Sequence, residues 1–183
     1  MKIKQIALLL LLIFSAQAFS QVKIEVLTGK PSRIKLKQVM PYSITAVYDV
    51  RKDTVNLGMV QLEEFGMPSK NIVLQIQPNL AMYVKAVLTK TFEENQPLLL
   101  ALKIKQLVLK GTYDKHTVAS GVYEFYVLKD NLYYSLGEVN AEGIGWAEDA
   151  IKESLANALK SLQGLGYERY KMMKGLEKGA ILE

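Results

Sequence analysis

The side chains that most often carry out catalysis are few in this chain and lie far apart. The 183 residues include one histidine, His116, and no cysteine. A lone histidine among polar residues is more often solvated than catalytic, and the common zinc sites need several histidines or cysteines. No Gly-x-Ser-x-Gly segment is present to hold a nucleophilic serine on a sharp turn. These residue types predict a protein that is not an enzyme and that uses no metal or cofactor.

Pairs of adjacent carboxylates and one short glycine motif are the other candidates for chemistry. The pairs are Glu63-Glu64, Glu93-Glu94 and Glu148-Asp149. Adjacent residues do not face each other on a helix, so we interpret these pairs as solvated charges rather than as a glycosidase dyad. The Gly-Ile-Gly segment that ends at Gly145 lacks the full glycine-rich fingerprint of a phosphate site. A hydrolase that acts on envelope material through a site without a sequence signature is the alternative function.

The first 18 residues have the three-part layout of a secretory signal peptide. Lys2 and Lys4 give a positive start, and residues 6–14 (IALLLLLIF) form an unbroken apolar run. An Ala-Gln-Ala sequence that ends at Ala18 then offers small residues for cleavage. The apolar run is too short to span a bilayer, which requires about 20 helical residues. We therefore expect cleavage near Ala18 and a periplasmic or secreted protein without a transmembrane anchor.

Composition and charge limit the class of fold and of partner. Apolar residues make up 50% of the chain and charged residues 22%, as in ordinary globular proteins. The formal net charge is +5, and it falls to +3 when Lys2 and Lys4 leave with the signal peptide. Nucleic-acid-binding domains usually carry a stronger, clustered basic patch, so we expect no nucleic acid as a partner.

The spacing of apolar residues predicts eight strands and two main helices. The strands are expected at 22–26, 33–37, 43–51, 54–61, 72–76, 98–105, 118–128 and 132–139. The helices are expected from Pro78 or Asn79 to about Phe92 and from Trp146 to about Gln163, after a loop at 140–145. This order predicts one α+β domain over residues 19–163, a two-layer sandwich with a mostly antiparallel sheet and both helices on one face. Residues 164–183 are expected to form a tail or a short helix.

Asp49, Arg51 and Gly58 form a candidate structural motif. Asp49 and Arg51 end the strand predicted at 43–51, and side chains two positions apart point to the same face of a strand. An ion pair between them would fix the strand end, although an exposed pair contributes only about 0–1 kcal/mol. Gly58 interrupts the next predicted strand and indicates a β-bulge there.

The same Asp-x-Arg string, followed by polar residues and Leu57-Gly58, resembles a known group of proteins. It is similar to the YajG-like bacterial envelope proteins and to the related auxiliary components of MCE-type lipid-transport systems. Those chains have an early Asp-x-Arg strand, a central helix, a long strand pair and a final helix rich in alanine and leucine, which would be residues 147–162 here. The resemblance spans residues 33–163 and implies an accessory module of the cell envelope. Family members usually carry a lipid-bearing cysteine, which this chain lacks.

Aromatic residues crowd the strand pair predicted between residues 112 and 139. The candidates for a partner surface are Tyr123, Phe125, Tyr126, Tyr133 and Tyr134. Alternation along a strand places Tyr123 and Phe125 on one face and Tyr126 on the other. Helices on one side leave one aromatic face open, and tyrosine suits partly wet recognition surfaces. We therefore predict a binding module for an envelope protein or an apolar ligand, whose aromatic face is covered by residues 167–183, by a second copy or by a partner.

Overall fold

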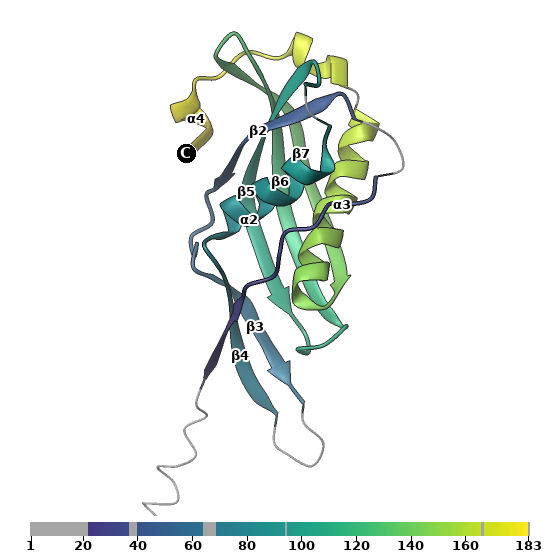
Figure 1. Ribbon diagram of the computed structural model, residues 1–183. Helices are drawn as coiled ribbons and strands as arrows, with labels where there is room; N and C mark the ends of the chain where they lie inside the picture. Colours follow the sequence, from purple (N-terminus) through teal and green to yellow (C-terminus); the bar gives the residue numbers. More distant parts are fainter. Residues whose placement is uncertain (1–21, 37–39, 64–68, 94, 166, 183) are drawn as a thin grey trace, which may run out of the picture.

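The computed structural model describes residues 22–36, 40–63, 69–93, 95–165 and 167–182 (Figure 1). Within these residues, the strands are β1 (Lys23–Leu27), β2 (Tyr42–Asp49), β3 (Asn56–Leu62), β4 (Lys70–Ile76), β5 (Leu98–Lys110), β6 (Thr117–Lys129) and β7 (Leu132–Gly145). The helices are α2 (Leu80–Thr91), α3 (Ala147–Leu165) and α4 (Lys178–Leu182), and a 3-10 helix covers Tyr167–Met172. The expected signal peptide lies outside the described residues.

The seven described strands form one mixed sheet in the order β1-β4-β3-β5-β6-β7, with β2 also paired to β5. The pairs β1–β4, β2–β5 and β3–β5 are parallel, whereas β3–β4, β5–β6 and β6–β7 are antiparallel. The expectation of a mostly antiparallel sheet is therefore wrong. The connection from β2 to β5 contains β3, β4 and α2, which gives it the length that a parallel pair of strands requires.

Two sequence-based boundaries are also wrong. Residues 33–36 do not form a strand, because the backbone N–H of Ile34 donates to Thr91 Oγ1 of α2, at 2.9 Å, instead of to a neighbouring strand. Residues 140–145 are not a loop but the end of β7, because they pair with residues 117–122 of β6.

The main core lies between the sheet and the helices α2 and α3. Asn79 caps α2, since its side chain accepts a hydrogen bond from Met82 N at 2.9 Å. Val84 of α2 and Leu155 of α3 are buried in the same cluster as Leu102 of β5. None of the helices within the described residues has both the length and the apolar character that a bilayer span requires.

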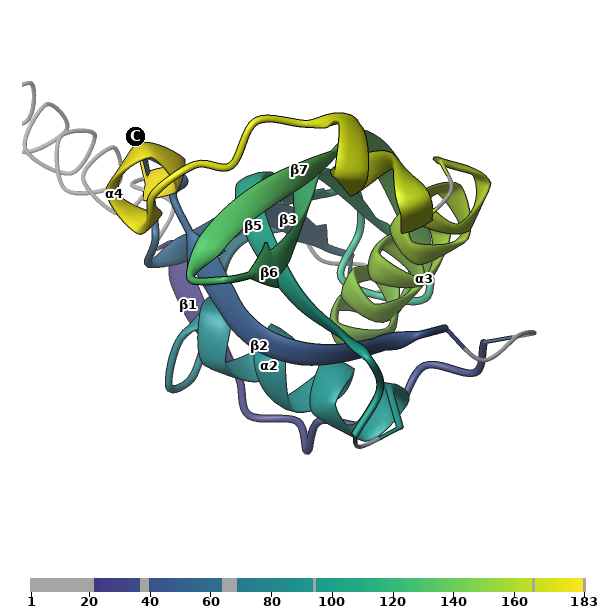
Figure 2. The same cartoon turned by 90° about the horizontal axis from the view of Figure 1, so that it is seen from above.

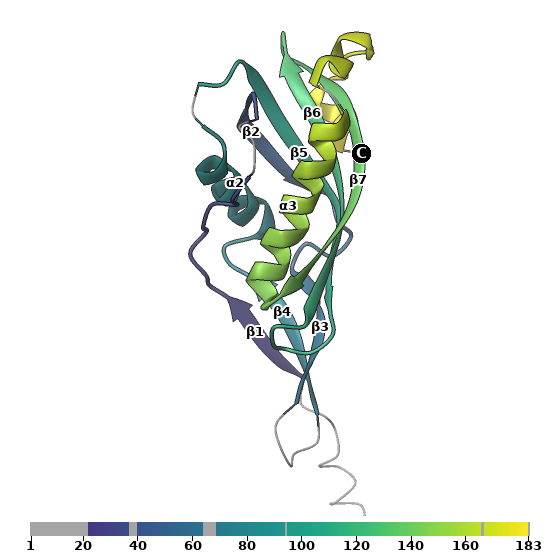
Figure 3. The ribbon, with the colours of Figure 1, turned by 90° about the vertical axis from the view of Figure 1, so that its right-hand side faces the viewer.

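A smaller cluster lies on the opposite face of the sheet. Ala101 of β5 belongs to it, whereas its neighbours Leu100 and Leu102 belong to the main core, so the two clusters occupy the two faces of β5. Ile181 of α4 is buried in this second cluster. Figure 3 shows α2 and the C-terminus on different sides of the sheet. The helices therefore do not all lie on one face, contrary to the sequence-based expectation.

Candidate functional site

Asp49 and Arg51 form a buried, bidentate ion pair at the end of β2. Arg51 Nε donates to Asp49 Oδ1 at 2.8 Å, and Arg51 Nη2 donates to Asp49 Oδ2 at 2.9 Å. The predicted ion pair is thus confirmed. Its setting differs from the expected exposed pair, because the two side chains are only 6% and 8% exposed.

The rest of the Arg51 guanidinium binds three backbone carbonyls. It donates to the carbonyl oxygens of Thr54, Asn56 and Leu107 at 3.1 to 3.3 Å. These carbonyls belong to the turn after β2, to the start of β3 and to the middle of β5. Arg51 therefore closes the gap where β2 leaves the side of β5 and β3 takes its place. The guanidinium is bound to Asp49 and to these carbonyls, so we interpret it as a brace, a side chain that holds the strand junction together, rather than as a catalytic group.

Gly58 brings β3 against β5 just beyond this gap. The β3–β4 register shifts between Asn56 and Gly58, which confirms the predicted bulge. Gly58 has φ of 141°, and a Cβ atom at this position would lie 2.2 Å from the carbonyl oxygen of Leu109. Only glycine allows this approach. Asp49, Arg51 and Gly58 are therefore three parts of one junction between strands.

Two open cavities flank the junction. One, of about 450 Å³, is lined by residues that include Arg51, Lys52, Asn56 and Lys105. The other, of about 600 Å³, lies between the ends of β2 and β4, and its lining includes Tyr48, Asp49, Asn79 and Leu182. Asp49 lines the larger cavity, and its two oxygen atoms are bound by Arg51, whereas Asp53 lines the smaller cavity.

The other polar candidates serve as local structural contacts. Asp114 accepts hydrogen bonds from the backbone N–H of His116 at 2.7 Å and from Thr112 Oγ1 at 2.8 Å, and these contacts lower the pKa of Asp114 to about 2. Glu148 accepts a hydrogen bond from Gly29 N at 2.7 Å, whereas Asp149 pairs with Lys152 at 2.6 Å.

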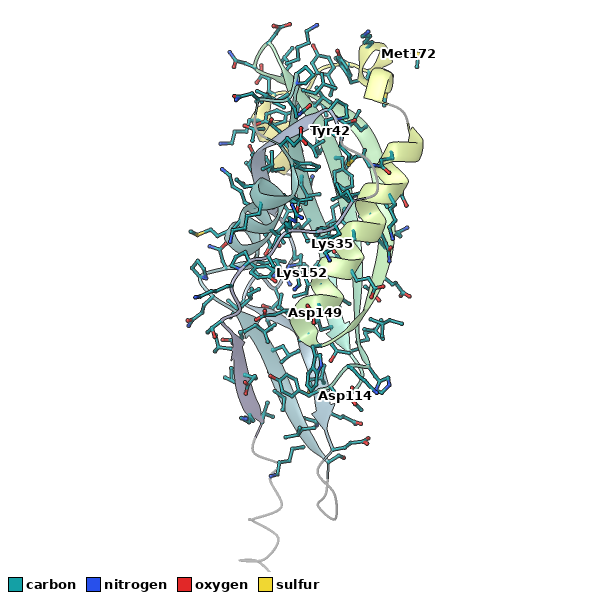
Figure 4. All side chains as sticks on the ribbon, turned by 45° about the vertical axis from the view of Figure 1, so that its right-hand side comes forward. Lys35, Tyr42, Asp114, Asp149, Lys152 and Met172 are labelled. Carbon is teal, nitrogen blue, oxygen red and sulfur yellow. The ribbon has the colours of Figure 1, made fainter. Side chains whose placement is uncertain are left out.

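Figure 4 shows Asp149 and Lys152 near each other, with Met172 at the far end of the molecule. Glu64 and Glu94, from the other two carboxylate pairs, lie outside the described residues. Within the described part of the chain, no cluster of three or more His, Asp or Glu side chains could hold a metal ion.

Tyr123 and Phe125 lie in the main core. Both are fully buried, and the Tyr123 hydroxyl lies 2.9 Å from Ser154 Oγ of α3. Burial raises the pKa of Tyr123 to about 12. These two members of the predicted partner surface therefore offer no accessible area.

Tyr126 and Tyr133 lie together on the opposite face of the sheet. Their ring centroids are 6.3 Å apart in an edge arrangement. Tyr48 of β2 joins them: its ring centroid lies 6.3 Å from that of Tyr133, and the two hydroxyls are 2.8 Å apart. We call Tyr48, Ala101, Tyr126 and Tyr133 the aromatic groove. Tyr48 was not among the predicted partner residues, although its position next to Val47, which packs on the main core, places it on the opposite face.

Tyr134 lies on the other face of the sheet from the groove, because it follows Tyr133 directly in β7. It pairs with Val127 of the main core. Its ring instead contacts Tyr170, with the centroids 6.2 Å apart. The five aromatic candidates are thus divided between the two faces.

Residues 173–182, which we call the C-terminal arm, cover the aromatic groove. Leu176 pairs with Tyr133 at the edge of β7 through two backbone hydrogen bonds of 2.8 Å. Lys178 Nζ lies 5.8 Å from the centre of the Tyr48 ring, and Ile181 is fully buried. Figure 2 shows the arm crossing over β7 to place α4 on the far side of the sheet from α3. Of the three expected occupants, which were residues 167–183, a second copy and a partner, the arm covers this face.

No family model and no curated protein matches the chain. Among solved structures, it is similar to a DUF330 protein from Xanthomonas campestris, with a TM-score of 0.40 and 8% identity over 81% of this chain and 97% of the other. A second similar structure is of an uncharacterised protein, with a TM-score of 0.33 and 10% identity over 78% of this chain and 99% of the other. These comparisons provide a DUF330 protein as a structural neighbour and place the chain in no family.

Proposed function

We propose that this protein is a non-enzymatic binding or accessory module of the bacterial cell envelope. It is exported by its N-terminal signal peptide and recognises a protein partner through the aromatic groove. One observation carries the proposal: three tyrosines from β2, β6 and β7 gather on the sheet face opposite the main core, beneath a short arm.

The composition of the groove suits protein recognition. Tyrosine is enriched among the interface residues that contribute most of the binding energy, because it offers a large rigid ring and a hydroxyl group. Here the rings of Tyr48 and Tyr126 are both packed against Tyr133, so little side-chain entropy is lost when a partner binds. Beyond the groove, the same face becomes polar, and Lys105 pairs with Glu138 at 2.5 Å. An apolar groove with a polar border is the usual layout of an interface.

Binding is favoured over turnover because the candidate catalytic groups are bound to one another. His116 Nδ1 lies 3.1 Å from Asp114 Oδ2 on an exposed turn. Asp49, which lies beside the larger cavity, is held by Arg51. A hydrolase would need a free acid, base or nucleophile directed into a cavity. Nothing in the described residues specifically favours that alternative.

The Asp-x-Arg string extends the proposal to lipid transport. The sequence resembles YajG-like proteins and auxiliary components of MCE-type systems, whose members work in the envelope. In this protein, Asp49 and Arg51 brace the strand junction. We propose that the string marks a shared scaffold and that the groove supplies the binding function on it.

Two measurements test the proposal. The intact mass of the exported protein should correspond to a chain that begins near Phe19, and a retained Met1 would contradict export. The wild-type protein should capture envelope proteins that the Tyr48→Ala/Tyr126→Ala variant does not. Trp146→Ala is the matched control, because Trp146 is 57% exposed and lies beyond the far end of β7 from Tyr133. Identical captured proteins with all three versions would exclude the groove.

A further inference from the structure

Two aliphatic side chains of the arm pack against the aromatic groove: Leu176 is partly buried there, and Ile181 is the one that is fully buried. Ile181 is fully buried and shares a cluster with Ala101, Tyr126 and Tyr133, whereas the adjacent Leu182 is 44% exposed. A fully buried side chain packed among aromatic rings is the usual form of an anchor in peptide recognition. Ile181 therefore defines the apolar position of a ligand for this groove.

A basic side chain accompanies the anchor. The Lys178 ammonium group lies 5.8 Å from the centre of the Tyr48 ring, within the range of a cation–π contact. Lys178 precedes Ile181 by three residues, so both side chains fall on one face of a short helix. The groove thus binds a basic side chain that is followed, three residues later, by an aliphatic side chain.

The backbone of the arm uses a free strand edge. Among the described strands, β7 pairs only with β6, and Tyr133 on its other edge exchanges two hydrogen bonds of 2.8 Å with Leu176. Addition of a peptide backbone to an open sheet edge is a common mode of peptide recognition. This contact uses the backbone of the arm, so segments of other sequence can form it.

The attachment of the arm is slight. Residues 173–175 form no helix or strand, and Met172 before them is 82% exposed. Helix α4 has only five residues, far fewer than the 12–15 or so that make an isolated helix marginally stable. A competitor needs to replace one backbone pairing, one cation–π contact, the partly buried Leu176 side chain and the fully buried Ile181 side chain.

We infer that the C-terminal arm is an internal ligand, which occupies the groove in the manner of the partner. The partner is a protein segment that pairs with the edge of β7 at Tyr133, places a basic side chain over Tyr48 and inserts an aliphatic side chain beside Tyr126. This inference rests on the proposed function and specifies its partner class. The arm protects the apolar groove until that segment displaces it.

The test uses the full chain and a synthetic peptide of residues 173–183 (MKGLEKGAILE). The Ile181→Asp protein should release its own arm and bind the peptide at least about tenfold more tightly than the wild type, because a tethered arm competes at high effective concentration. A Leu182→Asp protein is the matched control and should behave like the wild type. A peptide that carries Ile181→Asp should not bind, and one that carries Lys178→Ala should bind several-fold more weakly.

Other outcomes overturn the inference. One such outcome is a folded Ile181→Asp protein that binds the unmodified peptide and the Ile181→Asp peptide equally, and another is one that binds neither of them. Either result would show that the groove does not recognise the sequence of the arm. A wild-type dimer that dissociates when the arm is released would make a second copy the occupant. Saturable binding of a fluorescent fatty acid in place of the peptide would assign the groove to an apolar small molecule. If the peptide fails but capture of envelope proteins still depends on Tyr48 and Tyr126, the inference fails while the proposed function stands.

Discussion

The hydroxyl groups of Tyr48 and Tyr133 lie 2.8 Å apart and connect β2 to β7, two strands that β5 and β6 separate in the sheet. The contact is feasible because the sheet curves strongly at this end, and Figure 2 shows the β6–β7 hairpin extending over it. The curvature brings together residues that would be far apart on a flat sheet. The C-terminal arm then covers this groove.

The tyrosines predict a loss of stability in alkaline solution. Burial, together with the contact to Tyr133, raises the pKa of Tyr48 to about 12, against an ordinary value near 10 in the unfolded chain. A raised pKa in the folded state stabilises the protein below about pH 10, and this contribution is lost as the pH rises towards 12. Urea unfolding at pH values across this range should show the free energy of unfolding falling as the pH rises. In the Tyr48→Phe variant this fall should be less steep. An unchanged slope in the variant would contradict the assignment.

Removal of Arg51 should destabilise the junction strongly. Arg51→Met leaves the Asp49 carboxylate and three carbonyls without their donor, and breaking a buried pair in this way costs about 3–5 kcal/mol of unfolding free energy. The double variant Asp49→Leu/Arg51→Met should be less destabilised than Arg51→Met alone, because it leaves no unpaired charge. Lys52→Met, at an exposed neighbour, should stay within about 0.5 kcal/mol of the wild type in urea unfolding. If Arg51→Met lowers the unfolding free energy by less than about 1 kcal/mol, Arg51 does not stabilise the strand junction in the way described.

Gly58 and Gly164 should respond in opposite ways to alanine. At Gly58, the added Cβ would overlap the Leu109 carbonyl oxygen and would require a strained backbone, so we expect a loss above about 2 kcal/mol. At Gly164 in α3, an added Cβ would have no atom within 4 Å, and alanine should stabilise the helix by up to about 1 kcal/mol. Thermal melting of both variants makes the comparison. Equal changes would show that the β3–β5 approach does not depend on glycine.

Release of the arm should be a local event. In Ile181→Asp, a charge replaces the buried anchor, so hydrogen exchange at the Leu176 and Tyr133 amides should accelerate by about tenfold or more while the main core stays protected. Leu155→Asp is the contrasting variant, because Leu155 is buried in the main core and its replacement should unfold the domain. Loss of the whole fold in Ile181→Asp would mean that the arm is an integral part of the core.

Local patterns predicted the elements better than they predicted the partners of those elements. The apolar period located α2, α3 and most of the strands, and alternation placed Tyr123 and Tyr126 on opposite faces. The parallel pairing of β2 with β5 could not be predicted, because no local pattern specifies which distant strand lies alongside. The end of β7 was missed because Ala141 and Gly143 interrupt the apolar alternation with small residues.

In the candidate sites too, local spacing predicted some features, whereas others depend on parts of the chain that are distant in sequence. The Asp49–Arg51 pair follows from a spacing of two, but its burial depends on carbonyls from β3 and β5 that the spacing does not reveal. The face of Tyr134 follows from its alternation with Tyr133, but its contact with Tyr170 depends on the path of the chain after α3. Tyr48 enters the groove only through the fold, since 85 residues separate it from Tyr133.

Photo-crosslinking in the cells that produce the protein tests the central claim most directly. Tyr48 is replaced by a photoreactive phenylalanine analogue, and the same analogue at Trp146 provides the control, because Trp146 is exposed and lies beyond the other end of β7. We expect irradiation to join position 48, and not position 146, to another envelope protein as well as to the C-terminal arm. Crosslinks from position 48 that stay within the chain, or the same adducts from both positions, would contradict the assignment of the aromatic groove as the binding surface.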